Sequence, residues 1–229
     1  MKENQLRYCL TAITAVAAII TTAVLAHTSP VKAQSHEDDH DSRTEIGFQI
    51  APVPLNLQGK DRALVGLGSY WVNAVAACND CHSAGPPTQF LPGANPFFGQ
   101  QPTKINPATY LGGGRDFGPL TTAPDSPHIV SRNLTPDKTG LPVGGQSFSE
   151  FREILRTGAD LDHLHPPCSR GQTANCLPPP FNGDLLQIMP WYAFQSMTDR
   201  DVRAIYEYLS AIPCIEGPPP PNVLHNDCH

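Results

Sequence analysis

The residues with the most specific chemistry lie in one five-residue segment, Cys78-Asn79-Asp80-Cys81-His82. Two cysteines that are separated by two residues and followed directly by a histidine form the pattern that attaches haem c. Each thiol can add across a vinyl group of the porphyrin, and the short spacing then brings the next residue, His82, under the iron. The segment therefore predicts one haem c per chain, with Cys78 and Cys81 as attachment sites and His82 as an axial ligand.

The same pair of cysteines has two alternative interpretations, a redox-active dithiol and half of a zinc site. A thioredoxin-like dithiol stands at a helix N-terminus, where the helix dipole lowers the pKa of a thiol. Here the pair follows the predicted helix 61–77 and so lies at a C-terminal end. A zinc site would need a second Cys or His pair at ligand spacing, and the remaining cysteines are better explained as disulfides. Haem attachment is the interpretation that also uses the histidine.

An iron with histidine on one side needs a ligand on the other, and besides its first residue the chain contains two methionines. Met197 precedes Thr198, the predicted N-cap of the last helix, and Val202 follows at the fourth helical position, so Met197 fits a hydrophobic staple. Met189 has no such role, because it ends a loop and is followed by Pro190. We therefore expect Met189 to be the sixth ligand. The fallback ligands are His128, His163, His165, His225 and His229.

Helices are expected to position these groups. The first covers residues 61–77, where apolar residues recur every three or four positions and no proline interrupts. The second starts at Ser147, which forms a capping box with Glu150, and stops at Gly158.

The last helix starts at Thr198, with Asp201 as its reciprocal capping partner, and stops before Pro213. The connections between the helices are long and rich in Gly and Pro, and we expect short extended pieces in them at 110–111 and 128–130. The buried side of the last helix is predicted to consist of Val202, Ile205, Leu209 and Ile212.

Residues 1–33 have the pattern of an export signal. Lys2 and Arg7 precede an uncharged apolar stretch, residues 8–26, and a small-x-small cleavage site follows at 31–33. An uncleaved anchor, which would attach the protein to the membrane, is the alternative, because nineteen residues approach the roughly 20 that span a bilayer. The threonines in the stretch and the cleavage site favour removal of the signal, which predicts a periplasmic protein.

The composition describes the rest of the chain. Residues 34–60 are acidic and histidine-containing at first, then hold Pro52 and Pro54, and show no helical period, so we expect a linker or a loosely attached arm. With 40% hydrophobic residues among 229, the remainder is expected to form one globular domain with long loops. A net charge of -6 without a basic run argues against a nucleic-acid binder.

Export would place the other cysteines in an oxidising compartment, which favours disulfides. Four remain when the signal and the haem motif are set aside, and they allow three pairings. We favour pairing of nearest neighbours, which joins Cys168 to Cys176 and Cys214 to Cys228 and closes two local loops. By the loop-entropy model each bond would contribute roughly 2 to 3 kcal/mol. Their expected role is structural, and the second bond would tether the tail, residues 214–229.

Several short segments between residues 61 and 213 resemble a known family in their order along the chain. They are GSY at 68–70, CNDCH at 78–82, NLTPD at 133–137, TGLP at 139–142, FREILRTG at 151–158, MPW at 189–191 and MTD at 197–199. The set is similar to the monohaem class I cytochrome c domain that is repeated in the multihaem subunits of bacterial alcohol and gluconate dehydrogenases. An ordered set of motifs is more specific than C-x-x-C-H alone.

The resemblance implies an all-α, class I cytochrome c-like fold for residues 61–213, in which the helix before Cys78 crosses the C-terminal helix. It also implies that Cys78 and Cys81 hold the haem, with His82 and Met189 on the iron. This sequence departs from the family in its single haem motif, its long loops at 83–130 and 163–188, and its cysteine-bearing tail.

An iron with both axial positions filled is closed to substrate and dioxygen, which leaves outer-sphere electron transfer. Thioether ligation raises the reduction potential, which suits a periplasmic protein that passes electrons from a dehydrogenase to a respiratory chain. We therefore expect an electron carrier rather than an enzyme, with a redox protein, a dehydrogenase or an oxidase, as its partner. The alternative is a haem enzyme or gas sensor in which Met189 is labile and the loop between Cys168 and Cys176 gates the iron.

Overall fold

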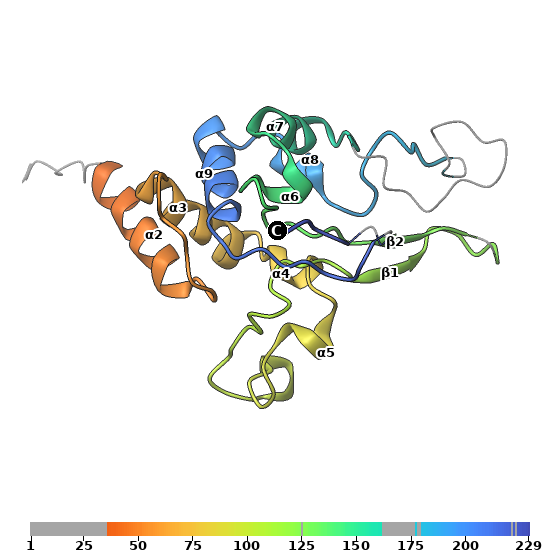
Figure 1. Ribbon diagram of the computed structural model, residues 1–229, viewed down its shortest axis with the longest axis horizontal. Helices are drawn as coiled ribbons and strands as arrows, with labels where there is room; N and C mark the ends of the chain where they lie inside the picture. The colour runs from red at the N-terminus through yellow and green to blue at the C-terminus, as the bar shows by residue number, and fades with distance from the viewer. Residues whose placement is uncertain (1–35, 125, 162–176, 178–179, 221, 223) are drawn as a thin grey trace, which may run out of the picture. The chain divides into compact units, whose positions relative to one another are not determined.

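The computed structural model describes residues 36–124, 126–161, 177, 180–220, 222 and 224–229 (Figure 1). Residues 39–229 form one compact unit, to which the following description applies. The predicted export signal and the predicted Cys168–Cys176 pair, with the loop between these cysteines, lie outside the described residues. Among the helices that are described, none is both long and apolar enough to cross a membrane.

Helix α3 (Arg62–Tyr70) begins where the sequence predicts. The Asp61 side chain caps it by accepting hydrogen bonds from two backbone N–H groups of the first turn, at 2.9 and 3.2 Å. The helix continues as the π-helical turn η1 (Trp71–Val75). The predicted helix is thus confirmed as far as Val75, whereas the change to wider π turns leaves no mark in the apolar spacing.

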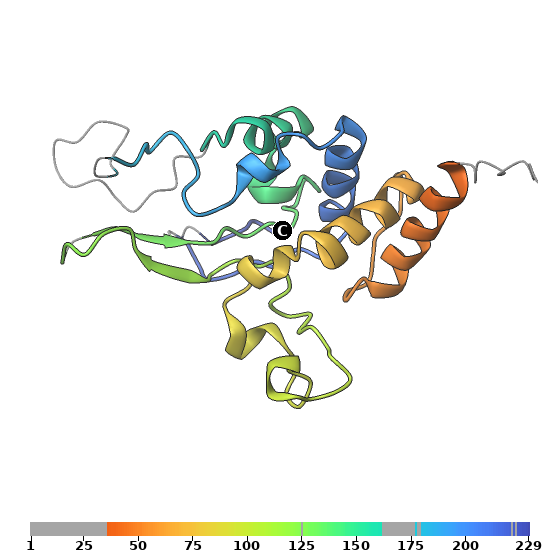
Figure 2. The ribbon, with the colours of Figure 1, turned by 180° about the vertical axis from the view of Figure 1, so that it is seen from behind.

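Helix α9 (Asp199–Leu209) packs against α3, as both ribbon views show (Figures 1 and 2). Thr198 is its N-cap, as predicted, and accepts a hydrogen bond from the N–H of Asp201 at 3.1 Å. The Asp201 carboxylate accepts from the Thr198 hydroxyl at 2.6 Å and from Nε1 of Trp71 at 2.9 Å, which ties α9 to η1. The buried side is the predicted one, Val202, Ile205, Leu209 and Ile212.

The two helices approach each other backbone to backbone at Gly68. A Cβ atom on Gly68 would lie 1.9 Å from the carbonyl oxygen of Ala204 and 2.7 Å from Cβ of Tyr208, both in α9. Only glycine allows this approach, because any side chain would overlap the backbone of the other helix. The crossing fixes the end of α3 and hence the position of the C-x-x-C-H motif that follows.

Residues 34–60 are not the irregular arm that the sequence predicts, because His36–Ile50 form helix α2. This helix packs against α3 so closely that a Cβ atom on Gly47 would lie 1.8 Å from the carbonyl oxygen of Gly66. The hydroxyl of Ser69 donates to the carbonyl oxygen of Gly47 at 2.6 Å. Thr44, Gly47 and Phe48 of α2 face Gly66 of α3, and only Phe48 among them is a large apolar residue, so hydrophobic periodicity does not reveal the helix.

Helix α7 (Phe148–Thr157) confirms the second predicted helix. Ser147 and Glu150 form the expected capping box, and Gly158 ends the helix in the left-handed conformation, with φ of 74°. The helix packs against the short helix α8 (Trp191–Phe194) and against α9. Its buried residues are Phe151, Ile154 and Leu155.

The long loops contain several short elements. Strand β1 (Asp116–Pro119) pairs antiparallel with β2 (His128–Val130), so the extended piece predicted at 128–130 is confirmed and a small sheet joins the helices. The extended piece predicted at 110–111 is wrong, because these residues form a turn in which Leu111 has φ of 60°. The other short helical elements of these loops are α5 (Pro86–Gln89), η2 (Pro96–Phe98) and α6 (Pro142–Gly145).

The C-terminal tail is anchored to the loop 131–135. Cys214 and Cys228 form a disulfide, which is the pairing that the sequence predicts. Asn226 donates from Nδ2 to the carbonyl oxygen of Thr135 at 3.1 Å, and Asn226 is buried. The tail therefore packs on the same loop that contacts His82 of the C-x-x-C-H motif.

Replacing both Cys214 and Cys228 by serine should lower the free energy of unfolding by about 2 to 3 kcal/mol. The bond joins residues with a sequence separation of 14, and its loss gives the unfolded chain more conformational freedom. Urea unfolding of the double variant and the wild type measures the difference. An unchanged midpoint would mean that hydrogen bonds such as that of Asn226 hold the tail without the disulfide.

Candidate functional site

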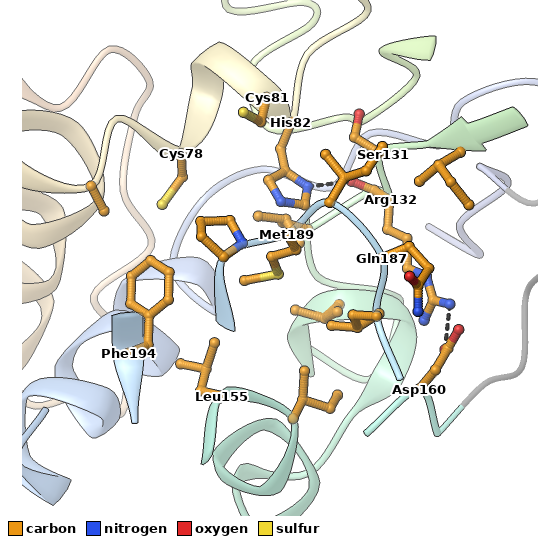
Figure 3. Close-up of a pocket in the computed structure, with 18 of the residues that line it drawn as sticks. Cys78, Cys81, His82, Ser131, Arg132, Leu155, Asp160, Gln187, Met189 and Phe194 are labelled. Atoms are coloured by element: carbon orange, nitrogen blue, oxygen red, sulfur yellow. Dashed lines mark hydrogen bonds and ion pairs between the residues drawn. The ribbon is translucent and has the colours of Figure 1, made fainter. Parts of the chain in front are cut away.

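One pocket brings together the four predicted site residues, Cys78, Cys81, His82 and Met189, which come from two segments far apart in the sequence. Figure 3 shows their side chains converging on this pocket. The rest of the wall is mostly apolar and comes from β2, the loop after it, α7 and the segment leading into α8. Met197, the alternative thioether, is not among the residues that line the pocket.

The two cysteines lie on a helical turn of their own, α4 (Cys78–Cys81). Ala77 precedes this turn in the left-handed conformation, with φ of 47° and ψ of 43°, so the chain changes direction directly before Cys78. The sequence predicted that the pair ends the preceding helix, and this prediction is wrong because the chain turns at Ala77. The break is hidden because alanine, rather than glycine, occupies the left-handed position.

The environment of Cys78 is unlike that of a redox-active dithiol. Burial is the main cause that raises the pKa of the Cys78 thiol to about 12, and the nearby Cys81 and Asp80 act in the same direction. A nucleophilic dithiol needs the opposite, a lowered thiol pKa. The two thiols are not bonded to each other. Within the described part of the chain, no group of three His, Cys, Asp or Glu side chains is placed to hold a metal ion.

His82 is held as a neutral imidazole. Its Nδ1 lies 2.9 Å from the carbonyl oxygen of Arg132, and because a carbonyl can only accept, Nδ1 carries the hydrogen. Burial lowers the pKa of His82 and outweighs the opposing effect of that hydrogen bond. The lone pair of Nε2 is then available to a metal, in the arrangement that fixes most metal-binding histidines.

The backbone of Gly113 and Gly114 is hydrogen-bonded to His82 and to the segment that contains Ser131 and Arg132. The N–H of Gly113 donates to the carbonyl oxygen of His82 at 3.0 Å, and the N–H of Gly114 donates to that of Ser131 at 2.9 Å. A Cβ atom on Gly113 would lie 2.5 Å from the carbonyl carbon of Arg132. Gly113 therefore fits between the backbones of His82 and Arg132 only because it has no side chain, and it stands in a run of three glycines at 112–114 that is the sequence signal for this approach.

A buried polar network next to Cys78 joins η1 to α9. The hydroxyl of Tyr110 donates to Oδ1 of Asn73 at 2.6 Å and lies 2.8 Å from the hydroxyl of Tyr208. Asn73 also donates from Nδ2 to the Tyr208 hydroxyl at 3.1 Å and to the carbonyl oxygen of Ser69 at 3.0 Å. Burial raises the pKa of both tyrosines, so they remain protonated donors. The network was not predicted, because its members share no local motif.

Met189 follows a strained residue. Ile188 has φ of 69°, a left-handed conformation that β-branched residues avoid, and its side chain is half exposed. The next residue turns inward, and Met189 packs against the core. Its N–H donates to the carbonyl oxygen of Gln187 at 2.7 Å, and its own carbonyl accepts from the N–H of Trp191 at 2.9 Å. Backbone strain of this kind concentrates at functional sites.

The pocket wall also carries an ion pair that the sequence did not reveal. Nη2 of Arg132 donates to Oδ1 of Asp160, and the two side chains are 19% and 2% exposed. Asp160 follows α7, and its N–H donates to the carbonyl oxygen of Asp184 at 2.9 Å. Both members line the pocket, so a largely apolar cavity has one strongly charged corner.

Comparison with known proteins gives one kind of relative. The chain is 28% identical over 162 residues to the protein named alcohol dehydrogenase (quinone), cytochrome c subunit, from Gluconacetobacter polyoxogenes, and to the protein of the same name from Komagataeibacter europaeus. The match covers 71% of this chain but only 24% of each relative, so the chain corresponds to about a quarter of their length. No family model and no solved structure matches. The similarity supports a relationship to the cytochrome c subunits of alcohol dehydrogenases. Their name describes a cytochrome subunit and not a catalytic subunit.

Proposed function

We propose that the protein is an electron carrier with one haem c, attached to Cys78 and Cys81 and bound at the iron by His82 and Met189. The observation that carries this proposal is the convergence of two thiols, a neutral imidazole and a thioether on one apolar pocket. The proposal includes a class I cytochrome c-like domain over residues 61–213, expected to be all-α, to which the small sheet of β1 and β2 is an addition. It also includes periplasmic location after removal of residues 1–33.

The residues in the pocket fit haem c. The thiols are unbonded and share one helical turn, as addition to the two vinyl groups of a single porphyrin requires. The Nδ1 of His82 is already engaged by a carbonyl, which leaves Nε2 for the iron. The side chains of α7 and α8 give the apolar surroundings that a porphyrin needs, among them Leu155 and Phe194 (Figure 3).

Haem c, when bound, supplies a one-electron iron couple whose potential depends on the axial ligands and on exposure to solvent. The carbonyl of Arg132 keeps the His82 ring in one orientation and one tautomer. Met189 provides a thioether, which stabilises the ferrous state. With both side chains bound to the iron, no axial position would be open to a substrate, and the largely apolar wall would limit the access of water. These residues favour electron transfer over substrate chemistry.

We infer that the electron donor is a dehydrogenase. The support is the name of the similar proteins, which are cytochrome c subunits of quinone-dependent alcohol dehydrogenases. The chain has a net charge of -6, so a donor with a basic docking face would associate faster through electrostatic attraction. A respiratory oxidase or another periplasmic carrier would then accept the electron.

Mixing the oxidised protein with a purified quinone-dependent alcohol dehydrogenase and ethanol should reduce the haem, which visible absorption would follow. The rate should fall as salt is added, because salt screens attraction between the acidic carrier and its donor. The control is the same mixture without ethanol. Reduction by dithionite but not by the enzyme, or rapid binding of carbon monoxide by the reduced wild type, would contradict the proposed carrier role.

A further inference from the structure

The proposed function gives no role to the charged side chains of Arg132 and Asp160, although the backbone carbonyl of Arg132 orients His82. Arg132 and Asp160 form a mostly buried ion pair on a wall that is otherwise largely apolar. Two charges in such a place lose hydration, and a hydrophobic pair of similar volume would often be as stable. An ion pair on the wall of a cofactor pocket is therefore explained best if it binds a charged group of the ligand.

If the cofactor is haem c, as proposed above, its chemistry indicates which charged group the ion pair binds. A porphyrin attached through two thioethers carries these bonds on one half of the ring and its two propionates on the other half. Figure 3 shows Cys78 on one side of His82, and Arg132, Gln187 and Asp160 on the opposite side. Attachment at the cysteines therefore directs the propionates toward Arg132.

We propose that the guanidinium of Arg132 binds a haem propionate, and that Asp160 holds the guanidinium in position for it. A guanidinium has five N–H donors in a planar fork, so one arginine can serve two carboxylates at once. Asp160 is itself fixed, because its N–H donates to Asp184 and its neighbour Ala159 forms a β-bridge with Leu185. Arg132 is the binding residue and Asp160 a positioning residue.

Arg132 would contact the cofactor site through both its backbone and its side chain. The backbone carbonyl of Arg132 accepts the hydrogen bond of His82, and its side chain faces the propionate edge. The ring of the axial histidine and the charge at the propionates are thus set by one residue. This residue lies in the loop that Gly113 packs against and that the C-terminal tail supports.

Resonance Raman spectroscopy of the haem-loaded protein tests this proposal, because the propionate bending mode reports hydrogen bonding to the propionates directly. Arg132→Gln should move this mode to lower frequency while the haem stays attached, and should lower the midpoint potential through loss of a positive charge. Arg156→Gln is the matched control, because Arg156 pairs with Asp199 and does not line the pocket. Its spectrum should match that of the wild type. A propionate mode that is unchanged in Arg132→Gln would overturn the proposal.

Asp160→Asn gives a second test if Arg132→Gln does not accumulate with haem. It removes the carboxylate that shares the guanidinium, so the propionate bond should strengthen and the mode should move to higher frequency. No movement would count against the proposal. The intact mass of the wild type separates this outcome from failure of the proposed function, because a wild-type chain without covalent haem would refute the cofactor itself.

Discussion

Replacing Cys78 and Cys81 together by serine is expected to abolish covalent haem attachment. Among the described residues that line the pocket, only these two thiols can add to vinyl groups, and a serine hydroxyl does not form this bond under the same conditions. Acid-acetone extraction of the exported protein measures the effect. Haem should remain with the wild-type protein pellet and should pass entirely into the solvent for the double variant.

The matched control is the other described cysteine pair. The variant with serine at both Cys214 and Cys228 loses a disulfide but keeps the pocket, so its haem should stay in the pellet. Extraction of the colour from the wild type would refute covalent attachment. Retention of haem by the variant lacking Cys78 and Cys81 would mean that the attachment site lies elsewhere.

Replacing Met189 by alanine is expected to free one axial coordination position of the haem iron. Met189 lines the pocket, so its loss should remove the weak sulfur-to-iron absorption band of the ferric protein, lower the midpoint potential and let the ferrous protein bind carbon monoxide. Met197→Leu is the matched comparison. Met197 precedes the N-cap of α9, packs against the core and does not line the pocket, so leucine should preserve its contact and the band.

The two methionine variants have to differ for the axial assignment to stand. Loss of the band in Met197→Leu together with its retention in Met189→Ala would reverse the assignment. Retention of the band in both variants would exclude a methionine ligand, and the histidines among the described residues would then be examined. A wild type that binds carbon monoxide as readily as Met189→Ala would favour the haem enzyme or gas sensor.

Patterns that act within one or two turns were predictable from the sequence. The caps of α7 and α9 depend on side chains three residues apart, and the structure places Ser147 and Thr198 where those pairs require. The C-x-x-C-H motif is equally local. Met189 was selected by comparing two thioethers, and its place in the same pocket as His82 agrees with that choice. Its bond to iron stays a prediction.

Several contacts between distant segments were not predictable, because their members follow no period and belong to no motif. Helix α2 meets α3 through Gly47 and Gly66, where the absence of a side chain makes the contact, and hydrophobic spacing cannot show it. The network of Asn73, Tyr110 and Tyr208 depends on three elements meeting in space. The pair of Arg132 and Asp160 is of the same kind.

The central claim is that one haem c is covalently bound to this chain, and the intact mass of the exported protein under denaturing conditions tests it most directly. We expect the mass of the polypeptide without residues 1–33 plus the mass of one haem. We also expect the addition to disappear when Cys78 and Cys81 are replaced. A mass equal to the polypeptide alone, from cells that attach haem to another c-type cytochrome, would contradict the account.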